Sequence, residues 1–295
     1  MHLLTDEDVL AASATVVVAA ARDALRQAGR GELATPPRTR SELGSVDYVY
    51  TAGALADGTS GFRVYRAGRP AGDQLVAGWD PGGRLIGQVV GDELGARRTG
   101  ALGAVAAEVL ARPEAETVGL VGTGRQAWTQ LWALTAVRNL SAVHVYSRDQ
   151  RRRDDFAARA RSELGLVANA VDDAASAVHG VDIVILATTS TMPVIDADDV
   201  ARGAHVTTVG PKTISGHEVP VRLVAAAAVV TCDSPQQAAA YPEPFFTGST
   251  PLVSLADVLV GAAAGRRHPD DITLHCSVGL AGSEVLLANR LLTGP

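Results

Sequence analysis

The chain has 295 residues, which exceeds one ordinary domain core and predicts two domains of roughly 100–200 residues each. Hydrophobic residues make up 47% of the sequence but aromatic residues only 4%, so the core must consist of small aliphatic side chains, which favours an α/β fold. The formal net charge of −6 argues against nucleic acid or an anionic membrane as a partner and favours a small-molecule ligand.

The cellular compartment is indicated by the lack of export and membrane signals. Residues 1–8 contain neither the basic nor the apolar region of a signal peptide, and no stretch approaches the ~18–20 uncharged apolar residues that cross a bilayer. Cys232 and Cys276 belong to no CxxC motif, so we expect two buried free thiols rather than a disulfide or a zinc site. We therefore expect a cytoplasmic protein.

The first hundred residues predict a helix followed by an antiparallel sheet. Thr5 and the acidic residues 6–8 are typical of a helix start, and the helix is expected to run through residue 9 to residue 28, where Gly29 ends it. Alternating β-branched and aromatic residues predict strands at 47–50, 61–66, 74–79 and 84–90. The sequence Asp-Pro-Gly-Gly at 80–83 predicts a tight hairpin turn between the last two strands.

After a long Ala-rich helix predicted at 92–111, the pattern changes. Arg112-Pro113-Glu114 breaks the helix, and we place the domain boundary there. Beyond it, strands are predicted at 117–121, 142–146, 181–187, 205–209 and 226–231, alternating with helices near 126–137, 150–164, 174–178 and 235–240. This alternation is typical of a parallel, doubly wound Rossmann sheet. The tail at 278–292 predicts a further amphipathic helix, and its periodicity does not decide which domain it packs on.

A dinucleotide-binding motif follows the first predicted strand of the second half. Residues 122–127 read Gly-Thr-Gly-Arg-Gln-Ala, a GxGxxA pattern between a predicted strand and a predicted helix. Gly122 provides the sharp turn, Gly124 allows the backbone to approach a pyrophosphate, and Ala127 permits close contact between helix and strand. The N–H groups at the start of the helix then face the anion, so we interpret the motif as an NAD(P) site.

The end of the next predicted strand indicates which nicotinamide cofactor is bound. An acidic residue there would accept a hydrogen bond from the ribose 2′-hydroxyl of NAD(H), and this acid is missing. Ser147 and Arg148 occupy the strand end and suit a 2′-phosphate, so NADP(H) is preferred over NAD(H). Arg152 and Arg153, which follow shortly, are interpreted as solvent-facing helix residues.

Four further segments, together with the GxGxQA loop, resemble the ornithine cyclodeaminase/μ-crystallin family. They are TPPRT at 35–39, ARRTGA at 96–101, ATTS at 187–190 and SVGLA at 277–281, in the family's order. The resemblance implies a homodimer whose substrate-binding and dimerisation domain comprises residues 1–112, completed by the C-terminal helix within 278–295. Residues 113–277 would form the Rossmann NAD(P)-binding domain. The cleft between them is expected to take an imino, keto or amino acid.

The same resemblance implies the roles of individual residues. Arg38 and Arg98 match the family arginines that bind the substrate carboxylate, and Val278 of the SVGLA motif is assigned to the same pocket. A guanidinium suits this task because it can grip a carboxylate with two hydrogen bonds. The expected cofactor contacts are Arg98, Thr99, Gly122, Thr123, Gly124, Arg125, Gln126, Ser147, Arg148, Thr188, Thr189, Ser190, Val209, Gly210 and Ser277.

Two positions depart from the family pattern. Arg63 stands where the family usually has a lysine that assists proton movement, and an arginine, which stays protonated, can orient charge but is a poor acid or base. Lys212 stands near the position where cyclodeaminases have an acid, and a cation there would repel an iminium ion. Lys212 is an acid–base catalyst if burial and Arg63 lower its pKa, or else a lysine on an exposed loop.

Histidines are the other proton sources considered. His217 follows the loop of Lys212, and His275 lies two residues before Ser277, so either side chain can titrate near neutral pH. The alternative for each is a packed or surface histidine without a catalytic role.

Together these features predict an NAD(P)H-dependent oxidoreductase that acts beside a carboxylate on a C=N bond, or on a C=O group followed by amine capture. Arg38 and Arg98, with Arg63, would hold the carboxylate, and Lys212 or water would supply the proton. An amino-acid dehydrogenase, which runs the same site in reverse, is an alternative, whereas ornithine cyclodeamination is disfavoured. An alternative of another class is an NADPH-dependent small-molecule binding protein with little turnover.

Overall fold

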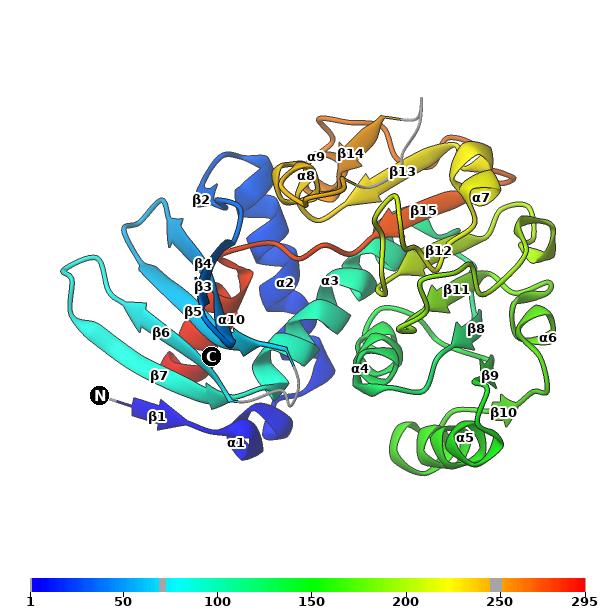
Figure 1. The fold of residues 1–295 in the computed structure, drawn as a ribbon, viewed down its shortest axis with the longest axis horizontal. Coiled ribbons are helices and arrows are strands. Elements are labelled where there is room, and N and C mark those ends of the chain that lie inside the picture. The colour runs from blue at the N-terminus through cyan, green and yellow to red at the C-terminus, as the bar shows by residue number, and fades with distance from the viewer. Residues whose placement is uncertain (1, 69–72, 245–250, 295) are drawn as a thin grey trace.

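The computed structural model describes residues 2–68, 73–244 and 251–294. Figure 1 shows two lobes, each built around one sheet, with helix α3 (Glu93–Leu110) running between them. Both termini lie at the lobe that contains the first sheet. The α/β fold class predicted from the sequence is confirmed, because one sheet is wholly parallel and the other is mainly antiparallel.

The first sheet, called sheet A, has the strand order β1-β7-β6-β5-β4-β2, with β3 also paired to β4. Its β1 and β7 are parallel, and its other pairs are antiparallel. The strands of sheet A are β1 (His2–Leu4), β2 (Leu33–Ala34), β3 (Thr39–Leu43), β4 (Val46–Leu55), β5 (Ser60–Ala67), β6 (Gln74–Trp79) and β7 (Leu85–Gly91).

The second sheet, called sheet B, is parallel throughout and has the order β10-β9-β8-β11-β12-β15-β13-β14. Strands β9 and β10 lie on one side of β8, whereas the next strand in the sequence, β11, lies on its other side. The strand order therefore reverses between β8 and β11. The strands of sheet B are β8 (Thr117–Val121), β9 (Ala142–Tyr146), β10 (Ala168–Ala170), β11 (Ile183–Leu186), β12 (His205–Thr208), β13 (Val229–Cys232), β14 (Leu252–Ser254) and β15 (Thr273–Cys276).

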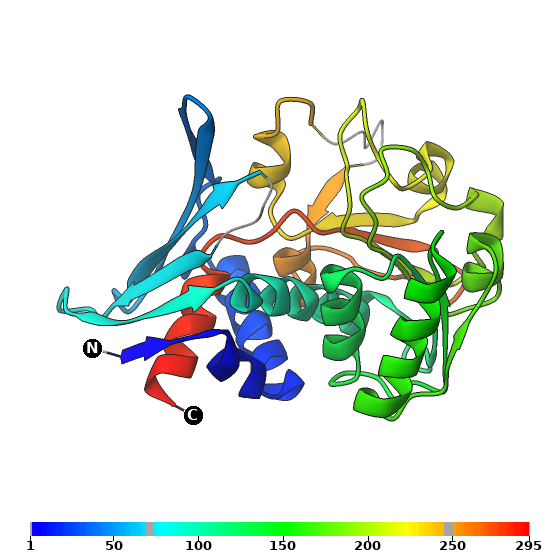
Figure 2. The ribbon, with the colours of Figure 1, turned by 60° about the horizontal axis from the view of Figure 1, so that its bottom comes forward.

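Helices cover both faces of sheet B and one face of sheet A (Figures 1 and 2). Besides α3, they are α1 (Asp6–Ala11), α2 (Ala14–Gly29), α4 (Arg125–Leu134), α5 (Gln150–Leu164), α6 (Ala174–Val178), α7 (Val221–Ala226), α8 (Pro235–Ala239), α9 (Leu255–Leu259) and α10 (Ser283–Thr293). A 3-10 turn is formed at Ala197–Asp199.

Helix α10 lies on a row of glycines that crosses sheet A. Gly53, Gly61, Gly78 and Gly87 are paired in register on four neighbouring strands. A Cβ atom at Gly53 would lie 2.2 Å from the Cα of Gly282, and one at Gly61 would lie 2.9 Å from the side chain of Val285. Because these glycines lack side chains, the helix backbone approaches the sheet closely, which fixes α10 against β5.

Helix α3 joins the two lobes through small residues. It is buried over most of its length and packs against α2 on one side and α4 on the other. A Cβ atom at Gly100 would lie 2.2 Å from the carbonyl oxygen of Thr129 on α4. The two helices therefore pack at a distance that only glycine allows, and this brings the first turns of α3 beside the start of α4.

The structure differs from the sequence prediction at the N-terminal helix. Instead of one helix over residues 9–28, the chain forms α1 and α2 with a break at Ala12, whose φ of −70° and ψ of 133° are extended. Ser13 then caps α2, because its hydroxyl accepts a hydrogen bond from the N–H of Val16. A local side-chain hydrogen bond thus competes with helix continuation.

The C-terminal helix begins later than predicted, and several short strands were missed. Residues 278–282 are not helical, because Gly279 and Gly282 adopt φ of +89° and +82°, so α10 starts at Ser283. The strands absent from the prediction are β1, β2, β3, β10, β14 and β15. Most of these have only two to four residues, too few for a pattern of alternation, and β15 carries buried Thr273 and His275 in place of apolar side chains.

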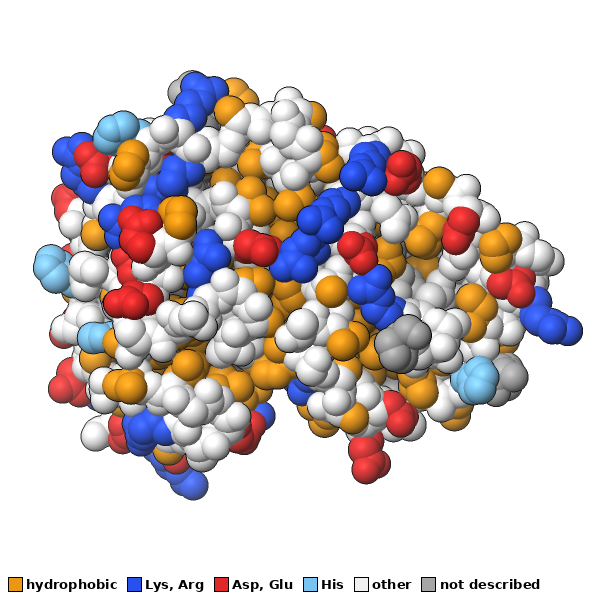
Figure 3. Space-filling model, turned by 180° about the vertical axis from the view of Figure 1, so that it is seen from behind, with side chains coloured by type: hydrophobic (Ala, Val, Ile, Leu, Met, Phe, Trp, Pro, Cys, Tyr) orange, Lys and Arg blue, Asp and Glu red, His pale blue; other side chains and the backbone are white. Residues whose placement is uncertain are grey.

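The distribution of surface charge and the state of the two cysteines can be compared with the predictions from the sequence. On the face in Figure 3, basic and acidic side chains are interspersed rather than gathered into a field of one sign. The predicted buried free thiols are confirmed at Cys232 and Cys276. None of the helices among the described residues has the length and apolar character needed to span a membrane.

Candidate functional site

A cavity of about 380 Å³ lies where elements of sheet A, helix α3 and the carboxyl edge of sheet B meet. Five charged side chains line it, four of them cationic. The lining residues are Arg38, Thr51, Arg63, Tyr65, Arg98, Thr99, Gln126, Val209, Gly210, Pro211, Lys212, Thr213, Gln237, Tyr241, Ser277, Val278, Gly279, Leu280, Ala281 and Glu284. All the residues predicted to contact substrate or to catalyse are therefore brought together.

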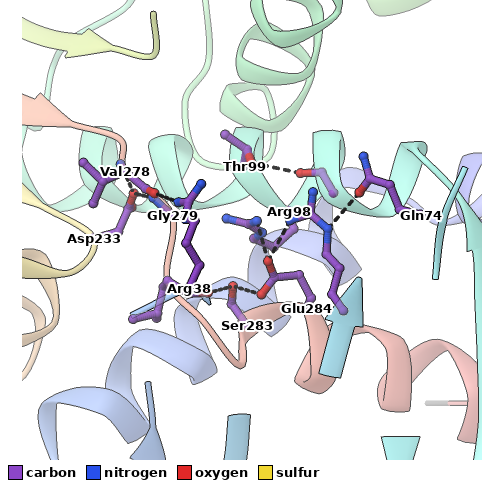
Figure 4. A network of polar contacts seen from close by, with 12 residues as sticks. Arg38, Gln74, Arg98, Thr99, Asp233, Val278, Gly279, Ser283 and Glu284 are labelled. Atoms are coloured by element: carbon purple, nitrogen blue, oxygen red, sulfur yellow. Dashed lines mark hydrogen bonds and ion pairs between the residues drawn. The ribbon is translucent and has the colours of Figure 1, made fainter. Parts of the chain in front are cut away.

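Arg98 faces the cavity from the second turn of α3 and is 5% exposed. Its Nη2 donates a hydrogen bond to Glu284 Oε1 at 2.6 Å (Figure 4), whereas its buried Nε and Nη1 have no hydrogen-bond partner among the described residues. A buried guanidinium N–H without a partner is costly, so these donors are available to an anionic ligand.

Glu284, in the first turn of α10, was not singled out by the sequence. One of its oxygens, Oε1, accepts hydrogen bonds from Arg98 and from Arg63 Nη1, the latter at 3.0 Å. Burial alone would raise the pKa of the Glu284 carboxyl, but the two guanidinium groups lower it. The only sequence signal for this contact is the row of glycines that admits α10 to sheet A.

Arg63 reaches the cavity from β5. Its Nε donates to Gln74 Oε1 at 2.8 Å, and its guanidinium lies 4.4 Å from the ring centroid of Tyr65. Together with the bond to Glu284, these contacts hold the guanidinium plane at the cavity wall.

Arg38, which precedes β3, borders the same wall. Its backbone N–H and its Nε donate to Gln237 Oε1 at 2.8 and 3.1 Å, and its Nη2 donates to the carbonyl oxygen of Val278. An ideal Cβ at Gly279 would lie 3.1 Å from Arg98 Nη1 and 3.2 Å from Arg38 Nη2. Both arginines predicted at the carboxylate thus flank Gly279.

Lys212 is buried rather than on an exposed loop, with 7% of its surface accessible. Its Nζ donates to the carbonyl oxygens of Gly210 at 2.5 Å and Val209 at 3.0 Å. Desolvation by burial lowers the pKa of Lys212, as the catalytic alternative requires, but the cation that lowers it further is Arg38 rather than the expected Arg63. Lys212 is also the single lysine of the sequence, among 26 basic residues, a signal that the sequence analysis missed.

Glu218, also missed, lies fully buried behind the loop of Lys212. Its Oε2 accepts hydrogen bonds from the N–H and the hydroxyl of Thr188, and its Oε1 from the hydroxyl of Thr208 and the N–H groups of Val209 and Gly210. One carboxylate thereby fixes the residues that follow β11 and β12.

Asp233 performs a similar task after β13. Its Oδ2 accepts hydrogen bonds from the N–H groups of Val278 and Gly279 at 2.8 and 2.7 Å (Figure 4), and its Oδ1 lies 3.2 Å from His275 Nε2. Burial would raise the pKa of Asp233, but His275 and the N–H of Gly279 lower it to about 2. His275 is fully buried and does not line the cavity, so it is a packed histidine.

His217 does not line the cavity either and lies partly buried, with Nδ1 3.3 Å from the carbonyl oxygen of Thr213.

The predicted cofactor residues follow the carboxyl ends of neighbouring strands of sheet B. Such a crevice, at the point where the strand order reverses, is where dinucleotides bind in sheets of this kind. Residues 122–126 follow β8, Ser147 and Arg148 follow β9, Thr188–Ser190 follow β11, Val209 and Gly210 follow β12, and Ser277 follows β15. Of the predicted contacts, the cavity is lined by Arg98, Thr99, Gln126, Val209, Gly210 and Ser277.

The start of α4 has the form that a pyrophosphate requires. Gly122 adopts φ of +112°, and a Cβ there would lie 2.3 Å from the carbonyl oxygen of Ala187, so only glycine fits this turn. At Gly124 the position of a Cβ atom has no neighbouring atom within 4 Å. There is therefore room for an anion beside the backbone at the N-terminus of α4, where helix N–H groups favour negative charge, and these residues fit a dinucleotide.

Arg125 and the residues after β9 show how cations are distributed around this crevice. Arg125 forms ion pairs with Asp92 and Glu93 at the start of α3. Arg148 is exposed, and the hydroxyl of Ser147 donates to the carbonyl oxygen of Asp149 at 2.9 Å.

Of the two arginines predicted to face solvent, Arg152 does, with 76% of its side chain exposed. The prediction is wrong for Arg153, whose side chain is 11% exposed, because it donates to the carbonyl oxygen of Ser147 and pairs with Asp172.

Among residues 2–68, 73–244 and 251–294, no cluster of three or more His, Cys, Asp or Glu side chains is arranged to hold a metal ion.

The chain is similar in sequence and fold to several known proteins. The chain is 32% identical over 217 residues to the Δ1-pyrroline-2-carboxylate reductase of Bacillus cereus, a match that covers 71% of this chain and 66% of the reductase. It is 25% identical over 221 residues to the ketimine reductase μ-crystallin of mouse, covering 74% of this chain and 68% of that protein.

A solved structure extends the likeness over the whole chain. The Δ1-pyrroline-2-carboxylate reductase of Thermococcus litoralis, in complex with NADH and L-proline, superimposes with a TM-score of 0.90 at 27% sequence identity, covering 99% of this chain and 97% of that one. The profile of the ornithine cyclodeaminase/mu-crystallin family matches residues 83–291, which is most of the sequence. The chain therefore belongs to the ornithine cyclodeaminase/mu-crystallin family.

Proposed function

We propose that the protein is an NAD(P)H-dependent oxidoreductase that reduces a C=N bond beside a carboxylate. The observation that carries this proposal is the cavity in which Arg38, Arg98 and Lys212 meet residues of the dinucleotide crevice, such as Gln126 and Ser277. Relatives named as pyrroline-2-carboxylate reductase and ketimine reductase, one of them bound to NADH and L-proline, support the same reaction class.

The four cationic residues of the cavity have separate tasks in this reaction. The residues that follow β8, β11 and β12 would hold a reduced nicotinamide, which would supply the hydride for the imine carbon. Arg38 and Arg98 hold the carboxylate and fix the face of the substrate, and the unpartnered Nε and Nη1 of Arg98 supply donors for it. As the electron pair of the C=N bond moves to nitrogen, the Lys212 ammonium gives that nitrogen a proton and becomes a neutral amine, which solvent reprotonates. Arg63 orients charge at the same wall.

The test is a spectrophotometric assay of the purified protein with NADPH and a panel of cyclic imino acids, pyruvate with amines, and branched 2-oxo acids with amines. We expect loss of the nicotinamide absorbance with at least one imine. Tight NADPH binding without any absorbance loss would favour the alternative of a nucleotide-dependent binding protein. Oxidation of amino acids with added NADP⁺, without reduction of any imine, would favour a dehydrogenase.

Cofactor preference is a separate part of the proposal, NADP(H) over NAD(H). Arg148 is exposed at the end of β9 beside Ser147, where a guanidinium and a hydroxyl can receive a 2′-phosphate. Arg148→Asp should lower the ratio of NADPH to NADH affinity at least tenfold, because the new carboxylate repels the phosphate. Arg152→Asp, on the exposed side of α5, serves as the control. An unchanged ratio in the Arg148 variant contradicts this assignment.

We also propose the domain division, the assembly and the compartment. Residues 1–112 with 278–295 form the substrate-binding and dimerisation domain, supported by the packing of α10 on sheet A, and residues 113–277 form the nucleotide domain. A homodimer is supported by the face of sheet A that no helix of the described residues covers. Free Cys232 and Cys276, opposite each other on β13 and β15, support residence in a reducing cytoplasm.

A further inference from the structure

We propose that Glu218 is a positioning residue, which holds the charged ammonium of Lys212 at the cavity wall and couples it to the turn at Thr188. The coupling runs through the peptide group between Val209 and Gly210. The proposal deepens the proposed function, on which it rests, because it names the residue that prepares the proton donor.

The peptide group between Val209 and Gly210 lies between an anion and a cation. Its N–H donates to Glu218 Oε1 at 2.5 Å, and its carbonyl oxygen accepts from Lys212 Nζ at 3.0 Å. The peptide dipole is thus aligned from the carboxylate to the ammonium, so each charge strengthens the hydrogen bond at the other end. Lys212 Nζ also donates to the carbonyl oxygen of Gly210, whereas the N–H of Val209 donates to Glu218.

Because Glu218 and Lys212 are both buried, the protonation of Lys212 depends on the charges near it. Glu218 is fully buried and Lys212 is 7% exposed, so neither charge is stabilised much by water. Desolvation lowers the pKa of Lys212 and Arg38 lowers it further, while Glu218, Cys276 and Asp233 raise it, Glu218 most of these three. Removing the negative charge of Glu218 therefore favours a neutral lysine, which has no proton to give.

The same carboxylate reaches the nucleotide crevice. Glu218 Oε2 accepts from the N–H of Thr188 at 2.8 Å and from its hydroxyl at 2.7 Å, and Thr188 Oγ1 in turn accepts from the N–H of Ser190. Thr188 and Ser190 belong to the predicted cofactor contacts. One side chain thus sets both the turn after β11 and the proton donor after β12, so cofactor binding and proton transfer share one support.

The single lysine of the sequence makes the coupling directly measurable. Protein labelled with ¹³C and ¹⁵N lysine gives a single lysine Nζ resonance, and the change of its chemical shift with pH reports the titration of Lys212 without any turnover. We expect the midpoint in Glu218→Gln to lie about one pH unit or more below that of the wild type. Glu243→Gln is the matched control, because Glu243 is an exposed carboxylate that accepts from Ser215 on the same loop.

Activity supplies the second readout. The rate of imine reduction by Glu218→Gln should fall at least tenfold at the wild-type optimum and recover as the pH is lowered, because acid restores the ammonium. The dissociation constant of NADPH should rise several-fold in the same variant. A merely structural defect would lower the rate at every pH.

An unchanged Lys212 midpoint in folded Glu218→Gln overturns the proposal. If that variant does not fold, Glu218→Asp, which keeps the charge but shortens the reach to Gly210, should show a smaller downward shift, and an unchanged midpoint there overturns it equally. A shifted midpoint in a protein that reduces no imine supports the coupling and defeats only the proposed function.

Discussion

The guanidinium of Arg98 has one nitrogen that is hydrogen-bonded within the described part of the protein and two that are not. Its Nη2 is fixed by Glu284, whereas Nε and Nη1 are buried and unpartnered within the described residues. Arg98→Ala should lower kcat/KM, with a loss of transition-state stabilisation of ~2–5 kcal/mol, the range typical of a buried charge that loses its partner. Steady-state kinetics checks this, with Arg40→Ala, an exposed arginine on β3, as the control. Unaltered kinetics in the Arg98 variant would contradict the carboxylate clamp.

Lys212 sets the pH dependence expected of the reaction. The ammonium is the form that donates a proton, so the rate should fall as the pH rises through the pKa of Lys212, which burial has lowered from 10.5. In Lys212→Arg the alkaline limb of the kcat/KM profile should disappear along with most of the rate, because arginine keeps its proton at these pH values.

The lowered pKa of Lys212 also makes the stability of the fold depend on pH. Because the folded-state pKa of Lys212 is below its unfolded value, the neutral lysine favours folding above pH 10.5, and this contribution is lost as the pH falls through the lowered pKa. For the kinetic prediction, an alkaline limb of the kcat/KM profile that is identical in the wild type and in Lys212→Arg would assign that limb to a group other than Lys212.

At the scale of elements, the glycine row under α10 is the contact on which the site depends. A Cβ at Gly53 would lie 2.2 Å from the Cα of Gly282, a backbone atom that cannot rotate away. Gly53→Ala should therefore displace the start of α10, destabilise the fold by about 1–3 kcal/mol and raise KM for the substrate, because Glu284 follows Gly282 by two residues. Thermal unfolding and kinetics check both effects, and Gly53→Val should enlarge them. Equal stability of all three proteins would show that α10 adapts.

Elements with a strong local pattern were predictable from the sequence. Strands β8 and β9 and helices α5 and α6 have the predicted bounds, because buried apolar runs and helix caps are local signals. The arginines and Lys212 were found through motifs. Glu218, Asp233 and Glu284 were not, because their partners are distant in the sequence or are backbone N–H groups that no side-chain pattern reveals.

At the scale of the whole molecule, the helices of the described residues leave one face of sheet A without a covering element. The face opposite α10 carries the register row Tyr50, Val64, Leu75 and Val90 and the stacked rings of Phe62 and Trp79. Figures 1 and 2 show helices against the other face only, among the parts of the chain that are drawn as ribbon. A contiguous apolar patch of this kind on a sheet is typical of a surface that is buried by association.

This uncovered face predicts the oligomeric state. A second copy of the chain, placed by two-fold symmetry, would cover Tyr50 and Phe62 with the same residues of its partner, so light scattering after gel filtration should give twice the mass of the 295-residue chain. Phe62→Glu buries a charge in that interface without touching the cavity and should shift the protein toward monomer, whereas Val221→Glu, at an exposed apolar residue on α7, should not. Because Arg63 lies on β5 beside Phe62, a monomer should also bind substrate less tightly. A monomeric wild type at micromolar concentration would leave the apolar face of sheet A to another partner and remove this argument.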